Sequence, residues 1–203
     1  VASYEAAVFG PNVDASDSPV VNIQWFNNLP GGGTPGDRAE VWVSGDGGTS
    51  WHSVWSHDAG GPAAPKFVTV DVSTFVANKS AARVQFIWLG TAESEGAFWT
   101  IDDFVMGCGN PPVVTNNASL PAAMNGGDTY TDSIAVSDNS PVGDTVFFSL
   151  KDAPDFMSLI PIVASPPVYP TTMVAAPDDG DAGSYSFFVM ATDAMNLRWV
   201  QEV

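Results

Sequence analysis

The stretch Ala39–Trp55, "AEVWVSGDGGTSWHSVW", places two short alternating runs on either side of a turn rich in Gly and Asp. Alternation of apolar and polar residues is typical of half-buried strands, because successive side chains of a strand point to opposite faces. The glycines permit positive φ, and Asp46 can accept hydrogen bonds from the turn backbone. The stretch therefore predicts a β-hairpin, since a lone carboxylate supplies too few ligands for a metal loop.

Similar short runs recur along the whole chain, whereas helical periodicity is almost absent. The run "ARVQFIWLG" (82–90) is apolar on both faces, which is typical of a central strand. The strands that we expect lie at residues 20–29, 39–44, 51–55, 66–72, 82–90, 98–106, 128–138, 144–154, 171–177, 183–194 and 197–203. The pattern predicts an all-β protein of two tandem β-sandwiches.

The boundary between the two groups of strands is marked by "GCGNPPVVTNNASLP" (107–121), which is rich in Gly, Pro and Asn. Such composition is typical of an interdomain connection. We therefore expect a first domain over 1–108, a linker over 109–116 and a second domain over 117–203.

Composition excludes several classes of function. Lys and Arg number 6 against 23 Asp and Glu, and the net charge of −17 would repel nucleic acid and anionic membranes. No apolar run reaches the roughly 18 residues that a membrane span needs, so we expect no membrane insertion. Cys108 is the only cysteine, which excludes an intrachain disulfide and a Cys-rich zinc site.

The first group of strands resembles the MAM-like jelly-roll modules of bacterial secreted proteins. The resemblance covers about residues 20–108 and rests on "AEVWVSGDGGTSWHSVW", the "DVS" turn at 71–73 and the closing "FWTIDDFVM" at 98–106. Only residues 1–19 precede the matching part, whereas such modules usually have further strands upstream. We therefore expect either a compact module or one whose first strands are missing or supplied by another chain.

Residues 117–203 resemble the Ig-like, cadherin-like domains of bacterial surface proteins. The most specific match is "DAGSYSFFVMATD" (181–193), which is similar to the closing strands of that family, and "GGDTYTDSIAVSD" (126–138) is similar to its opening strand. Both families are chiefly non-catalytic accessory modules. The resemblance therefore implies a binding or spacing role outside the cell.

Calcium is the cofactor that the resemblance implies. Asp102 and Asp103 are adjacent, so on a regular strand they would point to opposite faces, and a bulge would reverse that assignment. Jelly-roll modules often hold a structural calcium ion near their terminal strands, which implies that these two carboxylates are ligands; the alternative is that they cap backbone groups. In the second domain, cadherin-like carboxylates clustered at one end of the sandwich would be Asp138, Asp178, Asp179, Asp181 and Asp193, and the alternative is solvated turns.

Tryptophan side chains in the first domain are the candidates for ligand binding. Sugar faces are commonly bound by stacking on exposed rings, although most large aromatic side chains are core residues. Trp42 lies on the opposite face of its strand from Val41 and Val43, while Trp51 and Trp55 share a parity. We predict sugar contacts at Trp42, Trp51 and Trp55.

Catalysis is not expected from these residues. His52 and His57 lack the flanking pattern of a known triad, and the Asp102–Asp103 pair alone cannot act as acid and base from opposite faces. We expect non-catalytic extracellular or cell-surface modules of a larger protein that contact a glycan or a protein. The alternatives are accessory modules of a secreted hydrolase, and a structural subunit of a surface layer or filament that contacts other copies.

Overall fold

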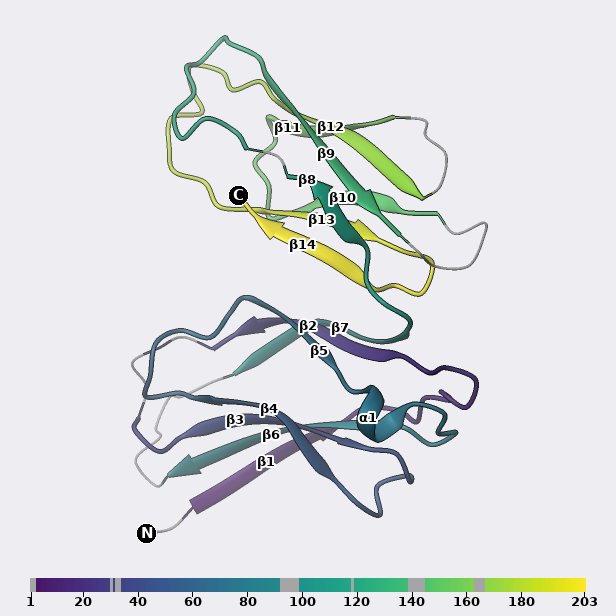
Figure 1. Ribbon diagram of the computed structural model, residues 1–203. Helices are drawn as coiled ribbons and strands as arrows, with labels where there is room; N and C mark the ends of the chain where they lie inside the picture. Colours follow the sequence, from purple (N-terminus) through teal and green to yellow (C-terminus); the bar gives the residue numbers. More distant parts are fainter. Residues whose placement is uncertain are drawn as a thin grey trace. The chain divides into compact units, whose positions relative to one another are not determined.

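The chain folds into four antiparallel sheets with a β-sandwich architecture (Figure 1). The computed structural model describes residues 3–29, 31, 34–91, 99–117, 119–138, 145–162 and 167–203. The chain divides into two compact units, Val1–Gly109 and Asn110–Val203. No helix within these described ranges is long and apolar enough to cross a membrane.

In the part of the chain that the structure describes, the elements follow one another as a run of strands with a single short helix. They are β1 (Ser3–Phe9), β2 (Val21–Asn28), β3 (Arg38–Ser44), β4 (His52–Asp58), β5 (Phe67–Asp71), α1 (Ser73–Val76), β6 (Arg83–Thr91), β7 (Thr100–Cys108), β8 (Val113–Asn116), β9 (Tyr130–Ser137), β10 (Phe147–Lys151), β11 (Met157–Pro161), β12 (Val168–Ala175), β13 (Phe188–Thr192) and β14 (Arg198–Glu202).

The first unit contains a sheet of order β1-β6-β3-β4 and a sheet of order β5-β2-β7. The predicted strand 82–90 corresponds to β6, which lies between β1 and β3, so its predicted central position is confirmed. The inner faces of both sheets pack around the fully buried Trp25 of β2. Its ring meets Trp55 of β4 at 5.5 Å and Phe86 of β6 at 5.7 Å, both edge to face, an arrangement that aromatic pairs favour.

The hairpin predicted from Ala39–Trp55 is confirmed, since β3 pairs antiparallel with β4. Gly47 and Gly48 adopt φ of 74° and 99° at the turn. The carboxylate of Asp46 accepts hydrogen bonds from the backbone N–H of Ser50 at 2.9 Å, from its hydroxyl at 2.6 Å and from Ser44 Oγ at 2.7 Å. The aspartate therefore closes the turn, as the sequence indicated.

A β-bulge interrupts β7 at Asp103. In the pairing with β2, Val105 lies opposite Gln24 but Asp102 lies opposite Phe26, so β7 has one residue more than its partner. Asp103 takes up the bulge with a φ of 51°, which Asp tolerates better than most residues. Before the bulge the odd-numbered Ile101 packs on the core, and beyond it the even-numbered Phe104 does so.

The second unit contains a sheet of order β11-β12-β9-β8 and a sheet of order β10-β13-β14. Its core includes the buried Ile134, Met173 and Val189. The expected linker 109–116 is wrong in its second half, because residues 113–116 form β8 and pair with β9. The two prolines before β8 gave this segment the composition of a linker, although its own residues satisfy their backbone groups in the sheet.

Asp46 gives the hairpin a dependence on pH. The Ser50 hydroxyl, the Ser50 N–H and the Ser44 hydroxyl hold the pKa of Asp46 well below its usual range. A carboxyl whose pKa is lower in the folded than in the unfolded state stabilises the fold fully above the unfolded pKa of about 3.9. That stabilisation is lost as the pH falls through the folded pKa.

We therefore expect Asp46→Ala to lower the melting temperature of the first unit by a few degrees at neutral pH. The difference from the wild-type protein should shrink as the pH approaches about 2. Circular dichroism melts across this range measure it, with Asp17→Ala as the control for loss of an exposed carboxylate. An Asp46→Ala deficit that stays constant with pH would contradict the assignment.

Candidate functional site

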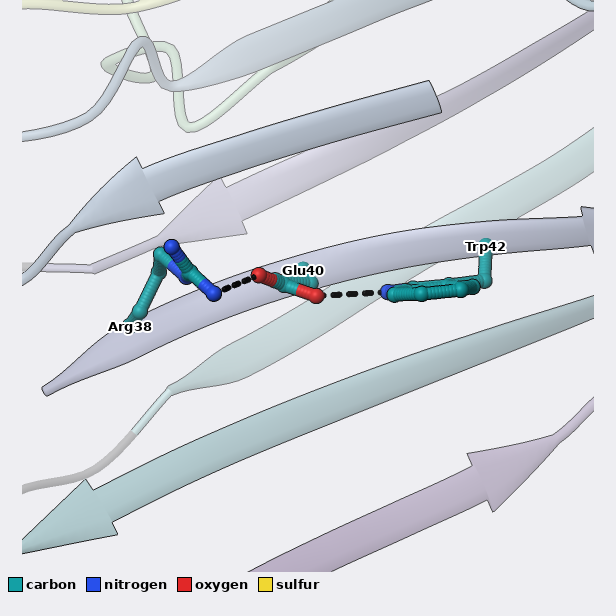
Figure 2. A network of polar contacts seen from close by, with 3 residues as sticks. All are labelled: Arg38, Glu40 and Trp42. Carbon is teal, nitrogen blue, oxygen red and sulfur yellow. Dashed lines mark hydrogen bonds and ion pairs between the residues drawn. The ribbon is translucent and has the colours of Figure 1, made fainter. Parts of the chain in front are cut away.

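Three side chains of β3 form a continuous array on the outer face of the β1-β6-β3-β4 sheet (Figure 2). Val41 and Val43 point into the core, so the alternation of the strand directs Arg38, Glu40 and Trp42 outward. Glu40 Oε1 lies 2.5 Å from the Arg38 guanidinium, and Glu40 Oε2 accepts the indole N–H of Trp42 at 2.6 Å. One carboxylate thus fixes both neighbours.

Burial distinguishes this array from an ordinary surface ion pair. Glu40 is only 5% exposed, while the Arg38 side chain is 52% exposed and Trp42 is half-buried. A carboxylate with so little solvent needs strong partners, and the guanidinium and indole N–H supply them. The array is therefore rigid, with the guanidinium and part of the ring accessible to a ligand.

Neighbouring strands extend the array into a surface. In register, Trp42 lies beside Gln85 of β6 and Ser53 of β4, and Gln85 in turn lies beside Phe9 of β1. At the other end of the array, Gly36, Asp37, Arg38, Asp58 and Leu89 line a depression of about 260 Å³. From Arg38 to Trp42 this outer face runs roughly 13 Å along β3, enough for a short oligosaccharide.

An aromatic cluster covers the hairpin end of the same face. The rings of Phe9 and Trp51 lie 6.0 Å apart, and the Arg83 guanidinium lies 5.8 Å from the Phe9 ring centre. Arg83 also donates to the Gly47 carbonyl, and the Trp51 indole N–H donates to the Gly48 carbonyl. Two of the three predicted tryptophans, Trp42 and Trp51, therefore belong to one face of the sheet.

Trp55 does not belong to that face, which corrects the sequence prediction. Its ring packs against Trp25 at 5.5 Å and is stacked with Trp99 at 5.9 Å, on the core side. The reason is a bulge in β4: Trp42 lies opposite Ser53 but Val41 lies opposite Trp55, so Val54 is an extra residue. This extra residue reverses the parity that Trp51 and Trp55 would otherwise share.

Asp102 and Asp103 are both exposed on the β7 bulge. The bulge therefore removes the expected alternation, in which one of the two carboxylates faced inward. Asp102 Oδ1 accepts the backbone N–H of Asp103 at 2.9 Å, which agrees with a backbone-capping role. Among the described residues no three His, Cys, Asp or Glu side chains come together as a metal site.

The five acidic residues singled out in the second unit do not cluster at one end, contrary to expectation. β12 pairs antiparallel with β9, so that Val168 lies opposite Ser137 and Ala175 opposite Tyr130. The segment after β9 and the loop after β12 therefore lie at opposite ends. β13 begins at the end where the loop after β12 lies, and it finishes at the end where the segment after β9 lies. The two groups are Asp138 with Asp193, and Asp178 and Asp179 with Asp181.

Asp193 has a structural role in the β13–β14 hairpin. It is buried, and its Oδ1 accepts the backbone N–H groups of Met195 at 2.9 Å and Leu197 at 2.8 Å. A buried carboxylate is stabilised by such donors. Asp193 therefore shapes the connection between two strands rather than facing a ligand.

The two histidines occupy separate environments. His52 stacks on Phe75 of α1 at 4.5 Å, on the opposite face of β4 from Ser53, which lies in the outer row beside Trp42. His57 Nε2 lies 2.9 Å from the carbonyl of Pro62. The stretch "WHSVWSHD" (51–58) therefore does not place a serine and an imidazole on the same face of β4.

Comparison with known protein families gives no match to this chain, and a search of curated proteins finds no significant relative. The two resemblances noted in the sequence therefore stay predictions, and the candidate site depends on geometry alone.

Arg38 and Glu40 were not among the residues predicted from the sequence. The sequence did contain a signal, because Arg, Glu and Trp occupy every second position of "RAEVW" (38–42). This spacing places them on one face of a strand. Phe9 and Arg83 had no such signal, since their place on this face depends on the pairing of β6 with β1 and with β3.

Calcium is not expected to stabilise the protein through the described carboxylates. The ion takes six to eight oxygen ligands, and neither Asp102 with Asp103 nor the divided groups of the second unit provide them. We expect the melting temperature to be the same with millimolar calcium and with EDTA, measured by differential scanning calorimetry. A rise of several degrees in calcium, with magnesium as the control, would support the calcium prediction.

Proposed function

We propose that the first unit is a non-catalytic glycan-binding module of a larger secreted or cell-surface protein, and that the outer face of the β1-β6-β3-β4 sheet binds the sugar. The observation that carries this proposal is the Arg38–Glu40–Trp42 array. It places an aromatic ring and polar groups along one line of the outer face of the sheet.

The chemistry of the array suits a sugar. The apolar face of a pyranose packs on an indole, while its hydroxyl groups need donors and acceptors in fixed positions. The Arg38 guanidinium supplies donors in a rigid fork, and Asp58 at the edge of the depression supplies acceptors. Because Glu40 already holds Arg38 and Trp42, little side-chain entropy is lost on binding.

The charge of the protein indicates which class of glycan the first unit binds. The chain carries a net charge of −17, and Glu40 neutralises the Arg38 guanidinium of the array. A polyanion such as a uronate-rich or sulfated polysaccharide would be repelled. The module is therefore a receptor for a neutral polysaccharide.

The finer assignment of the two sandwiches belongs to the same proposal. The first unit is a MAM-like jelly roll, and the second is an Ig-like, cadherin-like domain that acts as a spacer. The order of the sequence motifs and the confirmed hairpin at 39–55 support the first assignment. The strand pairs around 126–138 and 181–193 support the second.

We expect Trp42→Ala to weaken binding to a neutral polysaccharide by at least about tenfold, because a central aromatic contact is lost. Affinity electrophoresis in gels that contain neutral or acidic polysaccharides measures this effect. Phe147→Ala, which removes an exposed aromatic ring of the second unit, is the matched control and should bind as the wild type does. Unchanged mobility of a folded Trp42→Ala protein would exclude this site.

A second candidate function, assembly into a surface layer or filament, is favoured by β1. This strand lies at the edge of its sheet, and Val8 and Phe9 are 68% and 55% exposed. Exposed apolar edge strands are templates for pairing with another chain. The negative charge of the chain opposes such pairing unless salt screens it.

Assembly predicts oligomers that grow with protein concentration in high salt and that Val8→Lys removes, because a lysine blocks edge pairing. Sedimentation velocity measures particle size, and Val168→Lys, at a partly exposed apolar position of the second unit, controls for added charge. A monomer at every concentration and salt level would exclude this function.

A further inference from the structure

The second unit contains a cavity of about 470 Å³ that the function proposed above does not use. It opens at the end of the sandwich where the loop after β12 lies. Its walls come from the segment before β9, the loop between β10 and β11, the loop between β12 and β13, and Val203. Small-molecule sites in proteins have volumes in this range.

Two aromatic rings form a corner of this cavity. Phe156 and Tyr185 lie with ring centres 5.2 Å apart and planes at 85°, and both line the cavity. Tyr185 is 48% exposed, yet its hydroxyl donates to the backbone carbonyl of Asp181 at 2.9 Å. This hydrogen bond holds an exposed ring in place where a free one would rotate.

A carboxylate lies at the same corner. Asp181 lines the cavity, and its Oδ2 accepts the backbone N–H of Asp178 at 2.8 Å, while its own N–H donates to the Asp178 carbonyl. The turn therefore fixes the Asp181 side chain, and the backbone carbonyl of the same residue holds the Tyr185 hydroxyl. Neither basic residue of the second unit, Lys151 or Arg198, lines the cavity.

The remaining walls carry mostly apolar side chains, with Ser184 as a polar one. They include Leu120, Met124, Pro154, Met157, Phe187 and Val203. Such walls disfavour a strongly hydrated ammonium group, whose loss of water would be costly. They accept a cation whose charge is surrounded by methyl groups, because it is weakly hydrated and gains contact with the walls.

We propose that this cavity binds a small quaternary ammonium compound of the choline type. Its trimethylammonium group lies against the faces of Phe156 and Tyr185, which attract a cation through their π electrons. The Asp181 carboxylate balances the charge, and the apolar walls contact the methyl groups. A ligand phosphate would be repelled by Asp178, Asp179 and Asp181, so free choline binds more tightly than phosphocholine.

Calorimetric titration of the full chain tests the proposal with choline and its uncharged isostere 3,3-dimethylbutan-1-ol. We expect choline to bind at least about tenfold more tightly, because only the cation gains from the rings and the carboxylate. Equal affinity for the two compounds, tighter binding of phosphocholine than of choline, or no binding of choline would each overturn the proposal.

Variants locate the site. Tyr185→Ala and Asp181→Asn should each weaken choline binding at least several-fold, and Asp181→Asn should also reduce its dependence on salt. The asparagine keeps an oxygen for the Asp178 N–H, so this variant tests charge even if Tyr185→Ala fails to fold. Phe147→Ala, an exposed aromatic residue outside the cavity, should bind choline normally. Wild-type affinity in a folded Asp181→Asn protein would overturn the assignment.

Discussion

The aromatic contact between the two sheets of the first unit decides where the other side chains of that unit point. Trp25 is fully buried, and the rings of Trp55 and Phe86 meet it edge to face from the opposite sheet. Loss of a buried ring of this kind costs about 3–5 kcal/mol. Since the inner faces are fixed in this way, the alternation of side chains along β3 places Arg38, Glu40 and Trp42 on the outer face.

Local patterns in the sequence were sufficient for features that depend only on neighbouring residues. The hairpin at 39–55 follows from alternation and turn chemistry, and the central place of β6 follows from a run that is apolar on both faces. The outward array on β3 is accessible to the same reasoning. In each case the residues that give the signal are neighbours in the sequence.

Features that depend on pairing partners could not be predicted in this way. β8 is short, neither β1 nor β8 has a distinctive composition, and both become strands because β6 and β9 provide hydrogen-bonding partners. The inward position of Trp55 depends on a single extra residue in β4, which pairing with β3 alone defines. Likewise, only the antiparallel order of the second unit separates Asp138 from Asp178.

The bulge in β7 has a consequence for how this protein tolerates change. Asp103 is the extra residue that lets Ile101 on one side and Phe104 on the other both reach the core. Deleting it would leave Ile101 and Phe104 two positions apart, so both would still face the core on a regular strand. Replacing it with glycine or asparagine would preserve the bulge, whereas forcing the present sequence into a regular strand would turn Phe104 toward water. The core therefore accepts either two residues between Ile101 and Phe104 with a bulge, or one residue on a regular strand.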